Sequence, residues 1–318
     1  MKKKIVVNVS NLDSDESIFF GRELEHIKEQ TYDVLYPEYT ATRTIPVTSE
    51  AGSGADSITY RQFDRVGLMK VIANYADDLP RSDVKGKEYT VNVRSLGGSF
   101  GYNVQEVRAA MKAGRPLSAM KANSVRQAYE HAVNQIAYKA NPANPKFNGL
   151  QGLFYNPNVT KANNPSGKAW ADCTPDEIIA DVTFMINRPT ELTQGVEVVN
   201  TVLLPISQYG HIAGTPRSST SDTTILEFLK RVFPNVSFES IPECSNVKPK
   251  PSDPTGNESA NIAIAYNKRP DKLTLELPQL FEQFPPQERG LEIVVPCHAR
   301  VAGVIIYYPL SVIIMEGI

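Results

Sequence analysis

Residues 58–96 read ITYRQFDRVGLMKVIANYADDLPRSDVKGKEYTVNVRSL and carry the clearest structural pattern in the chain. Apolar and polar side chains alternate over residues 58–63 and again over 89–94, which is typical of β-strands. The segment between them, around residues 76–88, is charged and turn-like. Two strands joined in this way predict a long hairpin. Because an isolated two-stranded hairpin is marginal in water, we expect it to lie on another surface, most simply that of a second copy of the chain.

The residues before the hairpin predict a helix followed by an extended segment. Phe20, Leu24, Ile27 and Leu35 recur at helical spacing among charged residues, and Pro37 ends the pattern. Both flanks of this helix are polar and extended. We therefore expect residues 1–56 to form an arm with its own helix.

The residues after the hairpin predict a joint and then two helices. GGSFGYN, residues 97–103, is rich in turn-forming residues and predicts a joint. Residues 103–114 predict a short helix. Residues 116–140 predict a long one, with Pro116 in its first turn. Its predicted packing face carries small and apolar side chains: Leu117, Met120, Ser124, Ala128, Ala132 and Ile136.

The second half of the chain mixes helices and strands, so the fold class is α+β. Residues 174–192 predict a helix that Thr174 caps and that ends before Pro189. A strand is expected over 198–207, a helix over 223–233, and an exposed loop at the prolines of 242–254. The C-terminal residues from 291 onward are strand-rich and are expected to return to the sheet of an earlier domain.

Composition and charge exclude several classes of protein. Lys and Arg number 33 against 35 Asp and Glu, so the net charge is -2, without the basic excess of a dedicated nucleic-acid binder. Three distant cysteines argue against a disulfide framework and fit a reducing compartment. The most apolar stretch, residues 303–314, is shorter than a membrane span and contains Pro309. We expect a soluble chain that is made in a cytoplasm.

The search for catalytic or metal-binding spacing finds no convincing site. Cys297 and His298 are adjacent, but neighbours on a strand point to opposite faces, so we expect a buried thiol rather than a nucleophile and its base. No pair of Cys or His residues has the spacing of a zinc site. The glycine-bearing loops 51–57 and 97–101 lack phosphate-loop spacing. We therefore expect no enzyme activity, no cofactor and no metal.

Three runs in order carry a family resemblance: ITYRQFDRVGLMKVIANYADDLPRSDV (58–84), VRSLGGSFGYNVQEVRAA (93–110) and NGLQGLFYNPNV (148–159). Together with the long helix between the last two, they resemble tailed-phage major capsid proteins of the Johnson fold. Herpesvirus capsid floors and encapsulins share this fold. The resemblance is strong from about residue 19 to residue 159 and weaker beyond.

The resemblance implies a division of the chain into parts. Residues 1–56 would be the N-terminal arm and 57–95 the extended E-loop. Residues 96–165 would be the peripheral (P) domain, with its spine helix at 116–140. Residues 166–290 would be the axial (A) domain, and 291–318 the return strands of the P domain.

The resemblance also implies a function, partners and a set of contact residues. The chain would self-assemble, as hexamers and pentamers, into an icosahedral head that encloses a double-stranded DNA genome as a non-specific neighbour. The short lead before the arm helix implies a separate scaffolding protein beside a portal, and the fold allows a decoration protein. The E-loop residues expected to contact other subunits are Tyr60, Arg61, Phe63, Arg65, Asp77, Asp78 and Arg81. The hinge candidates are Gly52, Gly54, Gly97 and Gly98.

Three alternatives remain open from the sequence. Tyr60 or Phe63 could pack only within its own subunit. The shell could be an encapsulin-like nanocompartment that encloses protein cargo. The chain could also be a cytoplasmic enzyme with an unrecognised site, which would form a small oligomer and have a pocket with convergent polar groups.

Overall fold

The computed structural model describes residues 37–66, 83–113, 117–218, 220 and 222–318. The chain divides into two units, Met1–Glu38 and Tyr39–Ile318, and the helices and strands named here belong to the second. The predicted helix at 20–35 lies outside the described residues. So do three of the predicted contact residues, Asp77, Asp78 and Arg81.

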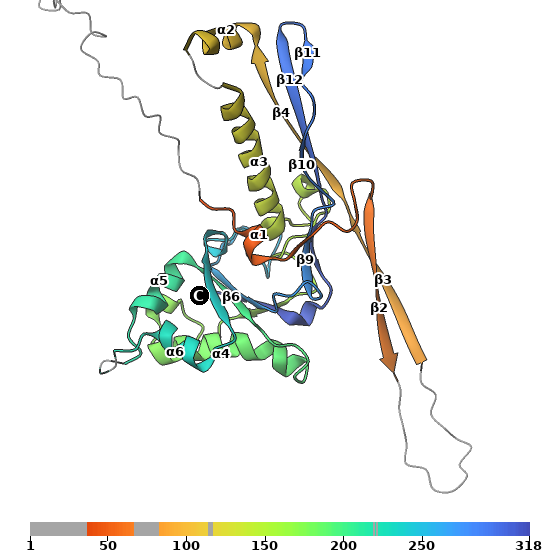
Figure 1. Ribbon diagram of the computed structural model, residues 1–318. Coiled ribbons are helices and arrows are strands. Elements are labelled where there is room, and N and C mark those ends of the chain that lie inside the picture. Colours follow the sequence, from red (N-terminus) through yellow and green to blue (C-terminus); the bar gives the residue numbers. More distant parts are fainter. Residues whose placement is uncertain (1–36, 67–82, 114–116, 219, 221) are drawn as a thin grey trace, which may run out of the picture. The chain divides into compact units, whose positions relative to one another are not determined.

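The predicted hairpin is confirmed, but its second strand begins at Asp83, within the segment predicted to be turn-like. β2 (Ser57–Val66) and β3 (Asp83–Asn92) pair antiparallel over ten residues each, with Tyr60 opposite Tyr89. Figure 1 shows the two strands extending away from the sheets as a ribbon of their own. The chain then passes through the buried Val93 into β4 (Arg94–Asn103).

The prediction of a turn-rich joint at residues 97–103 is wrong. These residues lie inside β4, which pairs with β12 (Glu292–Val301) in unbroken register, so that Gly97 faces His298 and Gly98 faces Cys297. Glycine is a turn signal when it is read locally, but a ten-residue partner strand supplies ladder hydrogen bonds whatever the side chain. β10 (Gln279–Gln283) and β11 (Gln287–Arg289) also pair with β12.

The two helices predicted after the hairpin are confirmed as α2 (Val104–Ala113) and α3 (Leu117–Lys139). In Figure 1, α3 runs alongside β4. Its last two turns enter the core through Val133, Ile136 and Ala137. The predicted packing face is partly wrong, because Ser124 and Ala128 are exposed.

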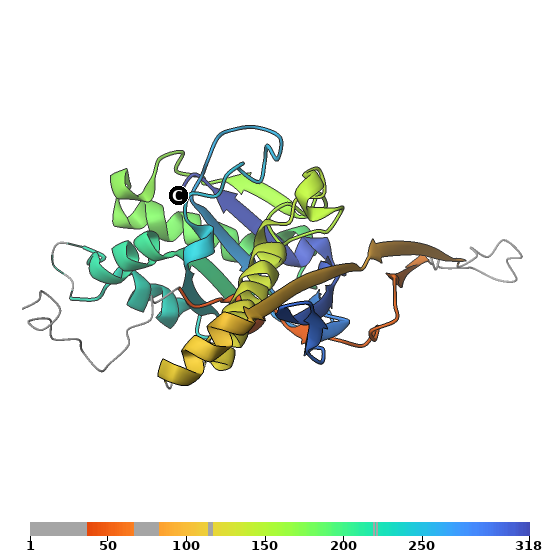
Figure 2. The same ribbon diagram turned by 90° about the horizontal axis from the view of Figure 1, so that it is seen from above.

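A five-stranded sheet separates two hydrophobic cores. Its order is β5-β14-β8-β6-β7, and helices α4, α5 and α6 pack against one face (Figure 2). The opposite face packs on the end of α3 and on residues 150–155. Successive side chains alternate between the cores, so Val202 and Leu204 lie in one and Leu203 in the other. The elements are β5 (Thr160–Asn163), α4 (Pro175–Leu192), β6 (Thr201–Pro205), α5 (Ile206–Gly214), α6 (Ile225–Val232), β7 (Ser237–Ile241), β8 (Ile262–Tyr266) and β14 (Val312–Glu316).

A small three-stranded sheet joins the N-terminal described residues to the C-terminal strands. The short helix α1 (Ala41–Thr44) precedes β1 (Val47–Thr48), which pairs with β9 (Leu273–Glu276), and β9 pairs with β13 (Gly303–Ile306). The 3₁₀ turns are η2 (Pro145–Phe147), η3 (Trp170–Asp172), η4 (Pro242–Cys244) and η5 (Pro309–Ser311).

Three further expectations need correction. α4 continues through Pro189 to Leu192, since a proline in the last turns removes one backbone hydrogen bond while its ring packs in the core. The proline-rich segment 242–254 is not wholly exposed, because Cys244 and Val247 are buried. The C-terminal strands do not return to one sheet, since β12 pairs with β4 whereas β14 lies beside β8. The sheets thus cross the expected boundaries at 165 and 290, and the division into named domains stays a prediction.

Candidate interaction surface

One face of the hairpin is exposed along its described length. We call it the outer hairpin face; its residues alternate along β2 and β3. Phe63 and Val84 lie on it with 63% and 59% of their surfaces exposed, which is unusual for apolar side chains. The outer hairpin face consists of Thr59, Arg61, Phe63, Arg65, Val84, Gly86, Glu88 and Thr90.

Cross-strand pairs hold the outer hairpin face in shape. Phe63 lies opposite Gly86, where an added Cβ would come within 3.1 Å of the phenyl ring. Because glycine has no Cβ, the ring can pack directly against the backbone of residue 86. Arg61 Nε donates to Glu88 Oε1 at 2.7 Å. This ion pair is exposed and adds little stability, but it orders the side chains next to Phe63.

The opposite face of the hairpin packs against the rest of the chain through Tyr60. The Tyr60 ring stacks on Tyr89 at 5.2 Å and meets the edge of Tyr307 at 5.1 Å. Burial raises the pKa of the Tyr60 hydroxyl, and the nearby Tyr89 and Tyr307 add to the rise. This packing favours the alternative in which Tyr60 acts within its own subunit, and a contact between subunits at Tyr60 stays a prediction.

A cleft of about 610 Å³ lies between β2 and the sheet that carries β9 and β13, and residues from both faces of the hairpin line it. Tyr60, Tyr307 and Tyr308 give it aromatic walls, and Glu50 and Arg65 give it charge. Its lining residues are Thr48, Glu50, Tyr60, Arg61, Gln62, Phe63, Arg65, Pro270, Asp271, Thr274, Tyr307 and Tyr308.

A buried polar cluster anchors the chain just before the hairpin. The Tyr138 hydroxyl of α3 shares hydrogen bonds with the hydroxyls of Thr40 and Thr44. Glu243 accepts from Thr40, and the Tyr266 hydroxyl donates to the Thr44 carbonyl at 2.6 Å. Burial raises the pKa of the Tyr138 hydroxyl, so this ring stays neutral. α1 is thus fixed to the core.

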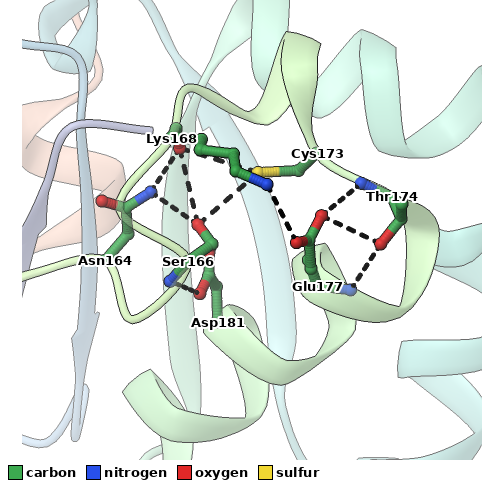
Figure 3. A network of polar contacts seen from close by, with 7 residues as sticks. All are labelled: Asn164, Ser166, Lys168, Cys173, Thr174, Glu177 and Asp181. Atoms are coloured by element: carbon green, nitrogen blue, oxygen red, sulfur yellow. Dashed lines mark hydrogen bonds and ion pairs between the residues drawn. The ribbon is translucent and has the colours of Figure 1, made fainter.

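A second polar cluster surrounds the start of α4 (Figure 3). Asp181 is buried and accepts from the backbone N–H and hydroxyl of Ser166 and from the indole N–H of Trp170. Thr174 and Glu177 form a capping box at the first turn. The Thr174 backbone N–H, then its hydroxyl and Lys168, hold the pKa of Glu177 below its usual range.

Asp181 has a structural role in this cluster, and Cys297 and His298 do not form a nucleophile–base pair. The three donors to Asp181 occupy its carboxylate, so its role is to fix the loop 164–173 on α4. Cys297 is buried, whereas its neighbour His298 lies on the other face of β12. Among the described residues there is no group of three or more His, Cys, Asp or Glu that could hold a metal.

The predicted site residues fall into separate places. Arg61, Phe63 and Arg65 lie together on the outer hairpin face, and Tyr60 lies on the other face. The hinge candidates Gly52 and Gly54 lie in the turn before β2, whereas Gly97 and Gly98 lie within β4, and a hinge role stays a prediction for all four. The sequence did not single out Val84 and Gly86. The alternation of Val84 with charged neighbours could have indicated an exposed strand. The register that places Val84 and Gly86 on the same face as Phe63 cannot be read from the sequence.

The comparisons with known proteins identify the family. Residues 67–318 match the family model described as major capsid protein. The chain belongs to the major capsid protein family. No curated protein matches it.

Solved capsid structures share the fold of this major capsid protein family member. The capsid of Myoviridae phage XM1 matches with a TM-score of 0.81 at 18% identity, covering 95% of this chain and 99% of that chain. The structure of Mycobacterium phage Ogopogo matches with a TM-score of 0.62 at 13% identity. The match covers 94% of this chain and 99% of that chain. The structure of Gordonia phage Cozz matches with a TM-score of 0.61 at 11% identity, and the match covers 98% of each chain.

The family assigns a structural role and a place. A major capsid protein is a component of the virion capsid and not an enzyme, so the family match does not favour the nanocompartment or the enzyme alternative. No helix in the described part of the chain is both long enough and apolar enough to cross a bilayer.

Proposed function

We propose that this chain assembles with many copies of itself, as hexamers and pentamers, into an icosahedral head that encloses a double-stranded DNA genome. One observation carries the proposal furthest: Phe63 and Val84 are exposed at diagonal positions on the same face of a hairpin that extends from the sheets. Exposed apolar side chains on a marginal two-stranded ribbon are stabilised by burial against a partner.

The neighbouring subunit is the proposed partner of the outer hairpin face. Phe63 and Val84 supply the apolar centre of the contact, and Arg61 and Arg65 supply charge beside it. A contact of this kind is modest for one hairpin. In a closed shell each subunit places its own hairpin on a neighbour and receives the hairpin of another. Each further contact is effectively intramolecular, so the assembly is strong.

Other components of the head are also proposed from family membership. A separate scaffolding protein would guide closure, a portal would occupy one vertex, and a decoration protein could bind the finished shell. The packaged DNA would be a non-specific neighbour, because the net charge of -2 provides no strong attraction for phosphate.

The test is electron microscopy of assembly reactions with three variants. Phe63→Ser and Val84→Ser each remove exposed apolar surface, and we expect fewer closed shells with both. Phe63→Leu keeps an apolar side chain and is expected to assemble nearly as well as the original chain. If Phe63→Ser and Val84→Ser form shells with normal yield, the outer hairpin face is not the contact.

A further inference from the structure

The turn that leads into the hairpin is weakly held by its own backbone. Residues 49–56 connect β1 to β2. Gly52 has φ +68°, a conformation that favours glycine, and an added Cβ at Gly52 or Gly54 would meet no atom within 4 Å. The hydrogen bonds within the turn are long, at 3.3 Å from Gly52 N–H to Ser49 and 3.4 Å from Ala55 N–H to Gly52.

Arg300 of β12 binds this turn at Ser53, between its two glycines, and at Asp56, just before β2. Arg300 Nη1 donates to the Ser53 carbonyl at 2.6 Å, and Nη2 donates to Asp56 Oδ1 at 2.6 Å. The side chain of Arg300 is only 13% exposed, so its guanidinium is held by its surroundings. A planar guanidinium that contacts two oxygens fixes a direction as well as a distance.

The other strand of the hairpin leaves the body at the same place. The Val93 N–H donates to the Asp56 carbonyl at 2.9 Å, and Val93 is buried. Two residues later, Ser95 lies directly opposite Arg300 in the β4–β12 ladder. Asp56 therefore connects both ends of the hairpin to Arg300.

The hydrogen bonds between Arg300 and the turn can also break. Asp56 is 95% exposed, so water and salt ions reach the carboxylate that Arg300 binds. The Arg300 Nε–H is buried and has no hydrogen-bond partner among the described residues, so the guanidinium is not fully satisfied in this position. The cleft beside Tyr60 leaves space on one side of the hairpin.

We propose that Arg300 is the positioning residue that sets the direction in which the hairpin leaves the sheets. The hydrogen bonds from Arg300 to Ser53 and Asp56 hold the hairpin in one direction. When water replaces these hydrogen bonds, the hairpin can take neighbouring directions. The consequence for a shell, in which one hairpin meets slightly different surroundings, rests on the proposed function. The positioning itself belongs to the single subunit.

Hydrogen exchange on the unassembled full-length chain tests the contact. Arg300→Gln and Asp56→Asn are each expected to speed exchange at the Val93 amide by about tenfold or more, the factor for one hydrogen bond to a charged group. Exchange at Ile264 in β8 should not change. Arg300→Lys keeps the charge and should fall between Arg300→Gln and the original chain. Arg126→Gln, on the exposed side of α3, is the matched control and should have no effect.

A distance measurement tests the direction. Spin labels at Lys87→Cys and Lys268→Cys, in a Cys173→Ser background, report the separation of hairpin and body. We expect a narrow distribution that Arg300→Gln broadens, and that high salt broadens in the original chain. An unchanged distribution in Arg300→Gln, or equal acceleration of exchange at Val93 and Ile264, would overturn the proposal. Shell yield from Phe63→Ser tests the proposed function separately, so the two failures are distinguishable.

Discussion

Glu276 as a whole residue is 4% exposed, and burial raises the pKa of its carboxyl although Thr274 and Tyr307 form hydrogen bonds with it. An acid whose pKa is raised by folding binds its proton more tightly in the folded state than in the unfolded chain. Its contribution favours folding at low pH and is lost as the pH rises through the raised pKa. This single residue therefore makes the subunit less stable at neutral pH than its packing alone would.

Glu276→Gln is expected to remove the loss of stability that the charged Glu276 causes at neutral pH. Glutamine keeps an oxygen that can accept from Thr274 and Tyr307 but has no charge to bury. Urea unfolding at several pH values above 4.5, the ordinary pKa of the group, should give a flatter profile and a higher stability at pH 7. Glu88→Gln, on the exposed hairpin, is the control. A profile as steep as that of the original chain would contradict the assignment.

Gly152 is required by close packing rather than by its backbone angles. An added Cβ would lie 2.7 Å from the backbone nitrogen of Ala140 and 2.7 Å from the Ile136 carbonyl oxygen. We expect Gly152→Ala to lower the free energy of unfolding by about 1–3 kcal/mol, as measured by urea unfolding. Gly210→Ala in α5 meets no atom within 4 Å and should instead raise it by about 0.5–1 kcal/mol. A neutral Gly152→Ala would show that the backbone can move aside.

At the scale of elements, local signals decided which parts could be predicted. α4 and α6 begin with Thr174 and Thr224, each in a capping box, and both helices were predicted close to their observed starts. The helix α5 and the strands β1, β5, β7, β8, β9, β10 and β11 were not predicted. β8 is buried on both faces, which removes the alternation that marks a strand. The glycines of β4 signalled a turn because their distant partner strand is invisible locally.

The outer hairpin face was also predicted only in part. Arg61, Phe63 and Arg65 follow from alternation within one strand, whereas the positions of Val84 and Gly86 depend on the register across the hairpin. The bonds from Arg300 to Ser53 and Asp56 span more than two hundred residues of sequence. No local pattern carries that information, so the structure was needed to find them.

The loop at the start of α4 depends on one buried carboxylate. Asp181→Asn would turn an amide group toward the Ser166 and Trp170 N–H donors, or leave one of these donors without an acceptor. We expect a loss of about 1–3 kcal/mol in urea unfolding. Asp172→Asn in the exposed part of the same loop should be nearly neutral. Equal effects of the two substitutions would contradict a specific role for Asp181.

At the scale of the whole molecule, the two cores share one sheet and the hairpin belongs to neither. Stability and assembly are therefore separable. We expect a chain in which a short Gly-Ser link replaces residues 62–88 to unfold at nearly the same temperature as the original chain, yet to form no closed shells. Calorimetry and electron microscopy measure the two properties. Shells of normal yield from this chain would rule out the hairpin as a major contact.

The central claim is that these subunits build a closed shell in which the outer hairpin face lies against another copy. Electron cryomicroscopy of particles from the full-length chain, produced with the other head proteins, tests it most directly. We expect uniform closed shells in which Phe63 and Val84 are buried against a neighbouring subunit. A small oligomer, or a shell in which both side chains remain in solvent, would contradict it.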